Sequence, residues 1–400
     1  MDFTLSPAEE DYRRRVAVFV AEQILPLEAD PENFSDHGNI PPTRLRTVRD
    51  KVKAEGLWAP NVPPSLGGLG LSFAALAASY EEMNRSVFGP ACFNAAAPDD
   101  GNMRLLSQIG TPEQQAWWLA PIVAGEERSA FAMTEPHPGS GSDPSMMLTR
   151  AERTNSGYRI HGRKWYITGA EGAGKFILMA RTSGDPRKGL TAFLFDAAQP
   201  GWRIERRIGI MGPEEHGGHC ELVFDGLEVP AEHVLLEEGD GLKVTQIRLG
   251  PARLTHCMRW LGLAKRCLEI ASAYASEREG FGVKLADRET VQVRLGDLAH
   301  RVEVGRLLTM KAAWELDQGG RAKTAVSMAK IHVAETLHAA ADGCIQICGA
   351  KGYSTDTVLE WIYRYARQAR LVDGADEVHK MVLAQAYARE GPQMWRWGAA

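Results

Sequence analysis

The apolar residues of this 400-residue chain change their spacing twice, and this change constrains the fold more than any other feature. Up to about residue 128 they recur every three or four positions, as on one face of a helix. From Ser129 the pattern becomes short β-branched and aromatic runs separated by Gly, Asn and Pro, which is typical of strands. Helical spacing returns near residue 239. The sequence therefore predicts a helical domain over 1–128, a β domain over 129–238 and a helical domain over 239–400.

Several predicted elements have defined starts. Ser6-Pro-Ala-Glu9 has the pattern of a capping box with proline in the first turn, and Thr111-Pro-Glu-Gln114 has the same form, so a helix is expected to begin at each. The last four predicted helices have the lengths of a four-helix bundle, and the predicted strands would form a small barrel or sandwich. The other predicted helices cover 43–55, 73–84, 242–276, 290–318, 322–348 and 376–388, and the strands cover 158–160, 165–168, 176–180, 191–195 and 221–224.

The composition, with 44% hydrophobic residues and a net charge of -5, is that of a soluble globular enzyme. Lys and Arg are scattered, so nucleic acid is not expected as a partner. No apolar run is long enough for a bilayer and the N-terminus lacks a signal pattern, so we expect no membrane association and a cytoplasmic location. No metal site is expected, because the six cysteines and the histidines lack the spacing of metal ligands. Two groups come nearest to it, the pair Cys344 and Cys348 and the triplet His216, His219 and Cys220, but neither has the further ligands that a site needs.

The segment from Arg364 to Glu377 contains a candidate catalytic base. Asp373 stands between Leu371-Val372 and Gly374. Apolar neighbours would remove water from the carboxylate and raise its pKa, and the glycine would let the backbone turn sharply and approach a ligand. An Asp-Gly pair is also a common turn signal. The role of Asp373 therefore depends on the rest of the sequence.

Four other segments accompany this one. They are Phe131-Ala-Met-Thr-Glu-Pro136 with Gly141-Ser-Asp143, Arg163-Lys-Trp-Tyr-Ile-Thr-Gly169, Arg278-Glu-Gly-Phe-Gly282 with Gln292, and Gln346-Ile-Cys-Gly-Ala-Lys-Gly-Tyr353. In order and spacing the five segments resemble the acyl-CoA dehydrogenase family from about residue 1 to about residue 390. The resemblance implies an acyl-CoA dehydrogenase-like fold with an N-terminal all-α domain, a middle β-barrel domain and a C-terminal four-helix bundle. It also implies an FAD cofactor and an acyl-CoA substrate.

The resemblance further implies a flavin site. Removing a proton beside a thioester and a hydride from the neighbouring carbon requires a hydride acceptor, which no side chain can be. Tyr166 stands where the family usually has Trp, with Trp165 just before it. The loop before Asp143 is about two residues longer than the commonest family form, so Ser142 is the first candidate for the pyrimidine contact and Ser140 the second. The implied flavin positions are Phe131, Met133, Thr134, Gly141, Ser142, Tyr166, Ile167 and Thr168, with Ala375 and Glu377.

A second group of positions matches those that reach the FAD pyrophosphate and adenine of a neighbouring subunit in the family. Arg can pair with phosphate through two parallel hydrogen bonds, and Phe can cover an aromatic face. Ala350 replaces a usual glycine in this group. A site shared between chains would make the protein a homodimer or a homotetramer. The positions are Arg278, Phe281, Gln292, Gln346 and Gly349.

The resemblance also implies the substrate contacts, which are Ser142, Arg253, Asp373 and Gly374. Arg253 falls at the position of a family Arg near the reacting end of the substrate. Some family members place their base on the same helix, but residues 249–255 contain no carboxylate here, so Asp373 is the best candidate. The family commonly has Glu at that position, and Asp is one methylene shorter.

Three functions are consistent with this Asp. The first is an FAD-dependent acyl-CoA dehydrogenase that uses Asp373 as base, transfers a hydride to flavin N5 and passes electrons to an electron-transferring flavoprotein. Within it, the motif from Arg370 to His379 resembles the subgroup associated with 4-hydroxyacyl-CoA breakdown through a 4-phosphoacyl-CoA. The second is a nitroalkane-oxidase-like flavin oxidase, which would be reoxidised directly by oxygen. The third is a non-catalytic or DNA-associated relative, for which the sequence shows no basic cluster.

Overall fold

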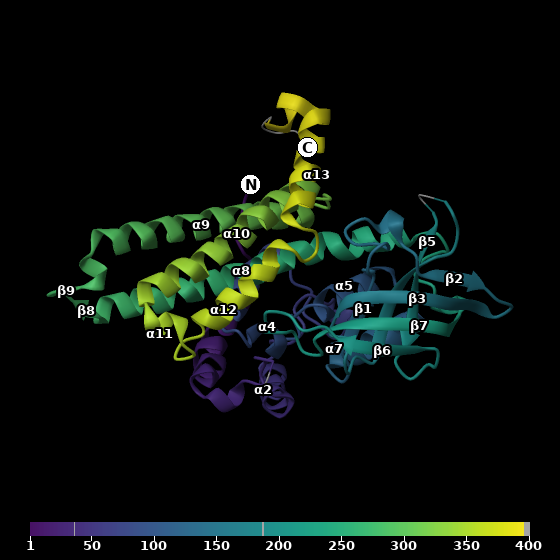
Figure 1. Cartoon of the computed structure of the whole chain (residues 1–400), viewed down its shortest axis with the longest axis horizontal. Helices are drawn as coiled ribbons and strands as arrows, with labels where there is room; N and C mark the ends of the chain where they lie inside the picture. The colour runs from purple at the N-terminus through teal and green to yellow at the C-terminus, as the bar shows by residue number, and fades with distance from the viewer. Residues whose placement is uncertain (36, 186–187, 396–400) are drawn as a thin grey trace. The chain divides into compact units, whose positions relative to one another are not determined.

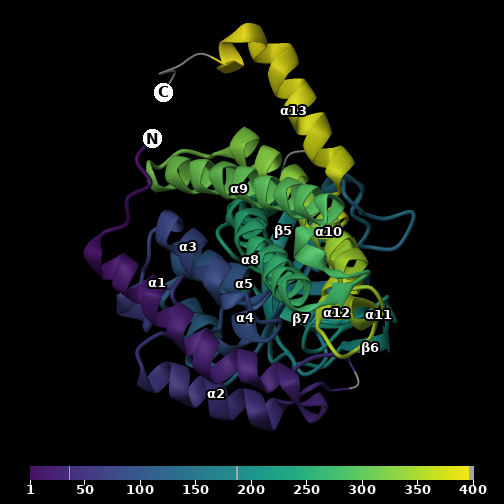
Figure 2. The ribbon, with the colours of Figure 1, turned by 90° about the vertical axis from the view of Figure 1, so that its left-hand side faces the viewer.

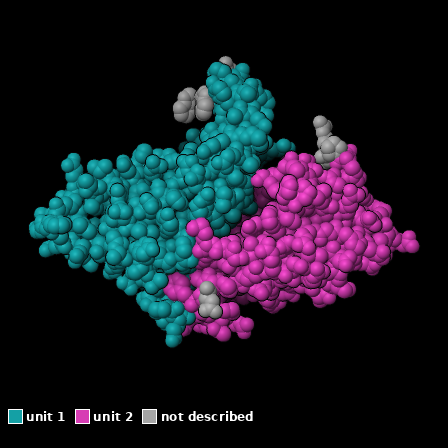
Figure 3. All heavy atoms as spheres, in the orientation of Figure 1, with its two compact units in different colours: residues 1–32, 72–90, 253–400 teal, residues 33–71, 91–252 magenta. Residues whose placement is uncertain are grey.

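The structure, a computed structural model, describes residues 1–35, 37–185 and 188–395. Its internal contacts divide the chain into two compact units, which Figure 3 shows in different colours. Unit 1 comprises residues 1–32, 72–90 and 253–400, and unit 2 comprises residues 33–71 and 91–252. This division follows contacts and not the change in apolar spacing, so the domain boundaries at 128 and 238 remain a prediction.

Unit 1 is helical, and the long helices α8, α9 and α10 lie side by side in it (Figures 1 and 2). Gly305 in α9 allows their close packing, because a Cβ atom there would lie 3.0 Å from Leu261 and 3.2 Å from Val333. Helix α13 projects away from these helices beyond its first turns (Figure 2). The helices are α1 (Pro7–Phe19), α3 (Phe73–Met83), α8 (Gly241–Glu277, which begins in unit 2), α9 (Glu289–Asp317), α10 (Lys323–Cys348), α11 (Ala350–Tyr353), α12 (Leu359–Ala366) and α13 (Asp376–Glu390), with a β8–β9 hairpin (Glu279–Gly280, Val283–Lys284).

The predicted helix starts are confirmed. The Ser6 hydroxyl accepts from the Glu9 amide at 3.3 Å and the Glu9 carboxylate accepts from the Ser6 amide at 3.0 Å, which completes the first capping box. Thr111 and Gln114 make the second. The four long C-terminal helices appear within three residues of their predicted ends, whereas α12 was not predicted.

Unit 2 contains a seven-stranded sheet with the order β1-β4-β2-β3-β7-β6, to which β5 adds through β4. Alternating apolar positions of these strands form its core, where the rings of Phe176 and Phe195 stack at 4.6 Å. The strands are β1 (Ser129–Ala132), β2 (Arg150–Arg153), β3 (Gly157–Thr168), β4 (Lys175–Arg181), β5 (Leu190–Asp196), β6 (Trp202–Arg207) and β7 (His219–Pro230), and the helices are α2 (Pro42–Ala54), α5 (Asp99–Ile109), α6 (Pro112–Gln114) and α7 (Ala120–Ala124), with α4 (Gly89–Cys92) at the unit boundary.

An irregularity in β3 determines what this strand presents to solvent. Strands β3 and β7 pair antiparallel, but their register shifts between Lys164 and Ile167. Tyr166, inside this bulge, has a φ of 50° and is 47% exposed, whereas Lys164 before it is fully buried. The bulge thus turns an aromatic ring outward beside the end of the strand.

Among residues 1–35, 37–185 and 188–395, no helix is both long and apolar enough to cross a membrane. No three His, Cys, Asp or Glu side chains in the same residues are grouped as ligands for a metal ion. All six cysteines are buried and free.

Candidate functional site

The end of β1 is joined by hydrogen bonds to the bulge in β3, which brings together the two motifs of unit 2 that were predicted to bind flavin. The Trp165 amide donates to the Thr134 carbonyl at 2.9 Å. The Lys164 ammonium group donates to the Met133 carbonyl at 3.0 Å. Tyr166, which follows Trp165, therefore exposes its ring next to the segment that carries Thr134.

A buried ion pair fixes the loop after Thr134. The Glu135 carboxylate lies 2.9 Å from the Lys164 ammonium group, and both side chains are at most 2% exposed. Glu135 also accepts from the backbone amides of Ser140, Leu148 and Thr149. Burial lowers the pKa of Lys164 to about 8, although Glu135 acts in the opposite direction. Because one carboxylate holds both ends of the loop, the loop is rigid at these points.

The same loop separates the two serine candidates. Ser140 is fully buried and its hydroxyl donates to the Met133 carbonyl at 3.4 Å. Gly141 and Ser142 are exposed. Ser142 is therefore the serine whose hydroxyl is accessible to a ligand, while Ser140 supports the loop.

At the end of β3, Thr168 contacts a histidine that the sequence did not assign to the site. The Thr168 hydroxyl lies 3.1 Å from Nδ1 of His219, which faces it from β7. Nε2 of His219 lies 2.9 Å from a carboxylate oxygen of Glu215. Ile167, between the bulge and Thr168, is buried and belongs to the core.

Phe131 has a cationic neighbour. The Arg248 guanidinium lies 5.0 Å from the centroid of the Phe131 ring, within the range of a cation–π contact. Arg248 is only 6% exposed and also donates to the Asn102 side chain at 3.3 Å. The half-buried Phe131 ring is thereby held in place.

These residues fit an isoalloxazine ring, which has an apolar face and a polar edge. The exposed Tyr166 ring offers an aromatic surface, and the half-buried Thr134 and Thr168 side chains offer hydroxyl groups beside it. Within the described part of the chain, the Thr134 amide donates to no other group, so it is available to a ligand. An aromatic surface flanked by hydroxyl and amide groups suits a bound flavin.

In unit 1, Asp373 lies on a turn whose backbone is held from two helices. Asp373 and Gly374 have φ values of 52° and 101°. The Arg253 side chain, from α8, donates to the Asp373 carbonyl at 2.7 Å, and Lys330, from α10, donates to the Gly374 carbonyl at 2.8 Å. A Cβ atom on Gly374 would lie 3.0 Å from Nε2 of His379. The turn is therefore fixed in a conformation that favours glycine at this position.

The Asp373 carboxylate faces a second histidine. Nε2 of His256 lies 3.2 Å from Oδ2 of Asp373, and the two side chains are 12% and 19% exposed. The His256 ring stacks on Trp260 at 5.1 Å, and Nδ1 lies 3.3 Å from a guanidinium nitrogen of Arg259. Since a guanidinium can only donate, Nδ1 accepts, and the proton of the neutral ring is on Nε2, the nitrogen that lies within ion-pair distance of Asp373. His256 thus faces the carboxylate.

Beneath the turn lies a buried cluster at the start of α13. Asp376 is 2.7 Å from Arg370 and 3.6 Å from Lys330, and the Asp376 and Lys330 side chains are almost fully buried. Burial and, to a lesser degree, the nearby charges of Arg253 and Lys330 together lower the pKa of His379 to about 4. His379 is therefore neutral near pH 7. Of the predicted flavin contacts here, Ala375 precedes the helix and Glu377 is exposed in its first turn.

One expectation about Asp373 is wrong. Leu371 was expected to shield the carboxylate from water, but it is 57% exposed. The chain turns between Gln368 and Leu371 with an amide-to-carbonyl bond of 2.7 Å, which leaves the leucine on the outside. His256 lies against the carboxylate instead, on a helix more than one hundred residues away in sequence.

The predicted pyrophosphate and adenine contacts lie at the other end of α10. Arg278 and Gln292 are exposed, and Phe281 is 103% exposed at the turn of the β8–β9 hairpin. Gln346 and Gly349 are exposed at the end of α10. Lys330, which touches the Asp373 turn, precedes Gln346 by 16 residues, which is roughly 24 Å along a helix. Within one chain, these residues are therefore far from Asp373.

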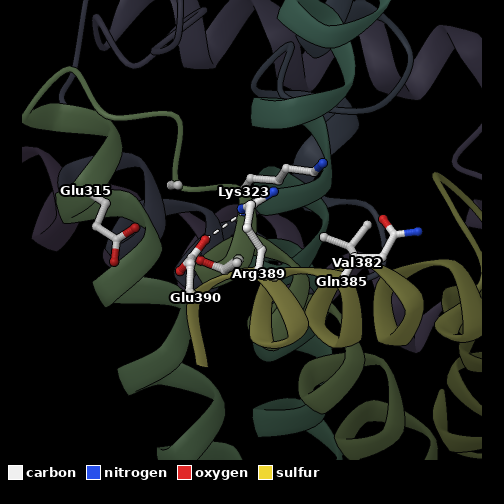
Figure 4. A pocket seen from close by; sticks show the side chains of 9 residues that line it. Glu315, Lys323, Val382, Gln385, Arg389 and Glu390 are labelled. Carbon is white, nitrogen blue, oxygen red and sulfur yellow. Dashed lines mark hydrogen bonds and ion pairs between the residues drawn. The ribbon is translucent and has the colours of Figure 1, made fainter. Parts of the chain in front are cut away.

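A surface pocket in unit 1 is separate from all these residues. Its volume is about 230 Å³ and Figure 4 shows that charged side chains of α9, α10 and α13 surround it. The Arg389–Glu390 ion pair at 2.7 Å lies at its rim. The lining residues are Glu315, Ala322, Lys323, Thr324, Val382, Gln385, Ala386, Arg389 and Glu390, none of which was predicted to bind cofactor or substrate.

Several residues around the two motifs were missed in the sequence. Lys330 had a signal, because it is the only Lys, Arg, Asp or Glu between residues 325 and 334. His256 also had one, since it follows Arg253 by three positions and shares its helix face. His219 was noticed only as a metal ligand candidate. Arg248 had no local signal, because its contact with Phe131 joins residues 117 positions apart.

Family models match nearly the whole chain. The N-terminal, middle and C-terminal domains of acyl-CoA dehydrogenase match residues 6–126, 130–227 and 239–388. Among proteins of known sequence, "Probable acyl-CoA dehydrogenase FadE2" of Mycobacterium tuberculosis is 37% identical, with 96% of this chain and 97% of that protein covered. Acyl-CoA dehydrogenase family member 11 of Gallus gallus is 36% identical over 93% of this chain, which spans about half (49%) of that longer protein.

Solved structures agree. A Mycobacterium abscessus protein described as an acyl-CoA dehydrogenase has a TM-score of 0.90 and 34% identity, with 97% of this chain and 99% of that chain covered. Butyryl-CoA dehydrogenase from Megasphaera elsdenii has a TM-score of 0.86 and 27% identity, with 97% and 100% covered. The predicted fold of a helical, a β and a helical domain is thus confirmed. The chain belongs to the acyl-CoA dehydrogenase family of FAD-dependent oxidoreductases.

Proposed function

We propose that this protein catalyses the α,β-dehydrogenation of an acyl-CoA thioester and that Asp373 is the base. The observation that carries the proposal is the carboxylate itself, which is 19% exposed and lies 3.2 Å from Nε2 of His256. A base of this kind must be held in reach of the substrate proton. The donation from Arg253 to the Asp373 carbonyl and from Lys330 to the Gly374 carbonyl fixes the turn for that purpose.

The chain supplies proton removal and positioning, while bound FAD supplies a hydride acceptor. Asp373 takes the proton from the carbon next to the thioester carbonyl. His256 keeps the carboxylate in one direction, and Gly374 lets the backbone of the turn approach the thioester. Limited exposure of the carboxylate leaves it weakly hydrated, which favours proton transfer to it.

The flavin contacts form two groups in this proposal. Phe131, Met133, Thr134, Gly141, Ser142, Tyr166, Ile167 and Thr168 would contact the isoalloxazine, and Arg278, Phe281, Gln292, Gln346 and Gly349 would hold the pyrophosphate and adenine. Ala375 and Glu377 are proposed as further contacts of the cofactor. Of the second group, Gln346 lies roughly 24 Å along α10 of the same chain from Lys330, which contacts the Asp373 turn. The separation supports a cofactor held between two subunits, and therefore a homodimer or homotetramer.

The substrate class is the finer part of the proposal. The motif from Arg370 to His379 resembles the subgroup linked to 4-hydroxyacyl-CoA and 4-phosphoacyl-CoA, and we propose such 4-substituted thioesters as substrates and an electron-transferring flavoprotein as electron acceptor. Arg253 supports an anionic or polar substituent near Asp373, because this residue carries a positive charge and is only partly buried.

Anaerobic mixing of the flavin-loaded protein with a panel of acyl-CoA thioesters tests the proposal. The panel includes 4-hydroxy and 4-phospho forms, and the loss of flavin absorbance at about 450 nm reports reduction. Asp373→Asn should remain yellow but be reduced about 10³-fold more slowly, because an amide cannot accept the proton. Asp373→Glu restores the family's usual carboxylate and should retain part of the rate.

The same experiment can contradict the proposal. Asp373→Asn reduced at the parent rate would exclude Asp373 as the base. Reduction by nitroalkanes followed by rapid reoxidation in air would indicate an oxidase instead. A 4-hydroxy or 4-phospho substrate that reacts no faster than the unsubstituted thioester would refute the proposed substrate class.

The shared cofactor site has its own test. Arg278→Ala should lower the flavin content or the subunit association measured by light scattering, because an Arg–phosphate pair would be lost. The matched control is Arg301→Ala, which removes an exposed arginine at a different place in unit 1, in α9. Equal flavin content and equal mass in both variants would remove Arg278 from the site.

A further inference from the structure

His219 is a buried histidine that the proposed reaction does not use. It is 6% exposed and lies opposite Thr168 in the β3–β7 pair. Its Nδ1 is 3.1 Å from the Thr168 hydroxyl, and its Nε2 is 2.9 Å from the Glu215 carboxylate. One ring therefore connects a carboxylate with a hydroxyl that belongs to the candidate flavin site.

The backbone around His219 keeps the ring in this place. The Ile208 amide donates to the His219 carbonyl at 2.7 Å, and the Gly169 amide donates to the Gly218 carbonyl at 2.7 Å. The first bond joins β7 to the end of β6, and the second joins the turn before β7 to the end of β3. Thr168 and His219 are thus fixed on neighbouring strands.

The donors and acceptors along this chain of groups allow two states. An ionised Glu215 can only accept, so Nε2, the His219 nitrogen that lies 2.9 Å from it, carries a proton. When His219 is neutral, Nδ1 accepts and the Thr168 hydroxyl hydrogen points to it. When His219 is protonated, Nδ1 donates to the Thr168 oxygen, and the hydroxyl hydrogen is then directed elsewhere. Protonation of His219 thus reverses the hydroxyl.

The surroundings favour the protonated state. Burial lowers the pKa of His219, but the contact and charge of Glu215 and the charge of Glu214 raise it overall. Arg207, at the end of β6, opposes them. Two further charged groups flank the region: Arg128, which donates to the Gly169 carbonyl, and Glu171, which pairs with Arg207.

We propose that Glu215 and His219 are positioning residues that direct the Thr168 hydroxyl toward the polar edge of the flavin and thereby raise its reduction potential. The inference rests on the proposed position of Thr168 at that edge. A hydroxyl that donates to the flavin stabilises the reduced, more electron-rich form. A hydroxyl that donates to neutral His219 does not. The flavin potential of this protein should therefore depend on the state of His219.

The test measures the flavin midpoint potential and the oxidised flavin spectrum of the FAD-loaded protein from pH 6 to pH 9. Glu215→Gln keeps the shape of the side chain and removes the charge that favours protonated His219. The variant should shift the oxidised–reduced equilibrium about tenfold toward oxidised flavin at pH 7, as expected for the loss of a buried charge–charge contact. For a two-electron couple this is about 30 mV. His219→Gln should remove the part of the pH dependence that arises from titration of His219, and Glu215→Gln should displace that part to lower pH.

The same two strands provide a matched control. His161 and Asp225 form a histidine–carboxylate pair at 3.3 Å across β3 and β7, but both side chains are exposed, at 47% and 82%. His161→Gln and Asp225→Asn should leave the potential unchanged at every pH. Thr168→Val should lower the potential and make Glu215→Gln silent in the double variant, because both act through one hydroxyl.

Each outcome decides a different question. If the potential and spectrum of Glu215→Gln follow those of Asp225→Asn, the positioning role of His219 is refuted even if substrates still bleach the flavin. If the potential shifts as expected but no acyl-CoA reduces the flavin, the proposed function fails and the role of His219 stands. A purified protein that carries no flavin would overturn both. Should His219→Gln fail to fold, Glu215→Gln and Thr168→Val still decide.

Discussion

The Asp373 turn in unit 1 and the Thr134 segment in unit 2 are held by the same kind of contact, a buried lysine that faces a buried carboxylate. Each has a fully buried lysine that donates to a backbone carbonyl, Lys330 to Gly374 at 2.8 Å and Lys164 to Met133 at 3.0 Å. In each case the lysine also faces a buried carboxylate. The two units therefore fix their candidate site segments with an ammonium group and not with packing alone.

The two lysine–carboxylate pairs differ in the groups that surround the carboxylate. Glu135 has Lys164 as its cation and accepts from three backbone amides besides. Asp376 faces Lys330 at 3.6 Å but lies closer, at 2.7 Å, to Arg370, which is 39% exposed. The ion pair in unit 2 is thus shielded from solvent, whereas the ion pair in unit 1 has a second cation, Arg370, in contact with solvent. This difference predicts that the loss of Lys330 destabilises the fold less than the loss of Lys164.

The largest expected effect comes from removing each lysine. Lys164→Met leaves the Glu135 charge buried without its cation and should lower the free energy of unfolding by about 3–5 kcal/mol. Lys330→Met should cost about half as much, because Arg370 still neutralises Asp376. Urea denaturation followed by circular dichroism measures both. Equal losses in the two variants would show that Arg370 does not compensate.

The buried histidines should give opposite pH dependences of stability. The folded pKa of His379 is about 4, below the unfolded value, so the unfolded state binds more protons between pH 4 and 6.5 and stability rises with pH there, by roughly 3 kcal/mol. The folded pKa of His219 is raised, so its contribution is present at low pH and is lost as pH rises through that pKa.

Denaturation at several pH values separates these contributions. His379→Gln should flatten the rise in stability between pH 4 and 6.5, and His219→Gln should lose stability mainly on the acidic side. His300→Gln, at an exposed position of α9, is the control. A parallel shift of all three stability curves would argue against both histidines.

A smaller effect is expected at His256, whose contact with Asp373 resembles that of His219 with Glu215. His256→Phe keeps the stacking on Trp260 but removes the donor to Asp373, and should slow flavin reduction by substrate about tenfold by releasing the carboxylate from one orientation. His256→Gln restores a donor and should recover part of the rate. Rapid-mixing kinetics from pH 6 to pH 9 measure both, and identical pH–rate profiles for Phe, Gln and parent would limit His256 to a structural role.

The smallest expected effect concerns Gly374. Gly374→Ala places a Cβ atom 3.0 Å from Nε2 of His379 at a φ of 101°, and should cost about 1–2 kcal/mol of stability. Gly296→Ala, where a Cβ atom would meet nothing within 4 Å in α9, should instead gain about 0.5–1 kcal/mol. Thermal denaturation compares them. A stabilising Gly374→Ala would mean that the turn can relax.

Helices were the most predictable part of the fold, because their signals are local. Ser6 and Glu9 act within one turn, and the apolar spacing of α8 to α10 extends over many turns. The strand β3 was predicted only as two short pieces, since its bulge between Lys164 and Ile167 arises from pairing with β7. Pairing joins residues far apart in sequence and leaves no local pattern.

The site was predictable where a motif carries it and not where two segments meet. Asp373, Thr134 and Thr168 stand in recognisable motifs. The residues that orient them do not, because His256 reaches Asp373 from α8 and His219 reaches Thr168 from β7. Leu371 shows the reverse error, since its position beside Asp373 in sequence says nothing about the side of the turn on which it lies.

The bare ring of Phe281 has a consequence for handling the protein. An aromatic side chain that is 103% exposed on a hairpin turn loses nothing when the chain is alone, but gains contact area once another molecule covers it. If that cover is the adenine of a flavin bound mainly by a second chain, cofactor retention becomes a matter of mass action. Dilution should then release FAD from the protein, and added FAD should slow the dissociation of its subunits.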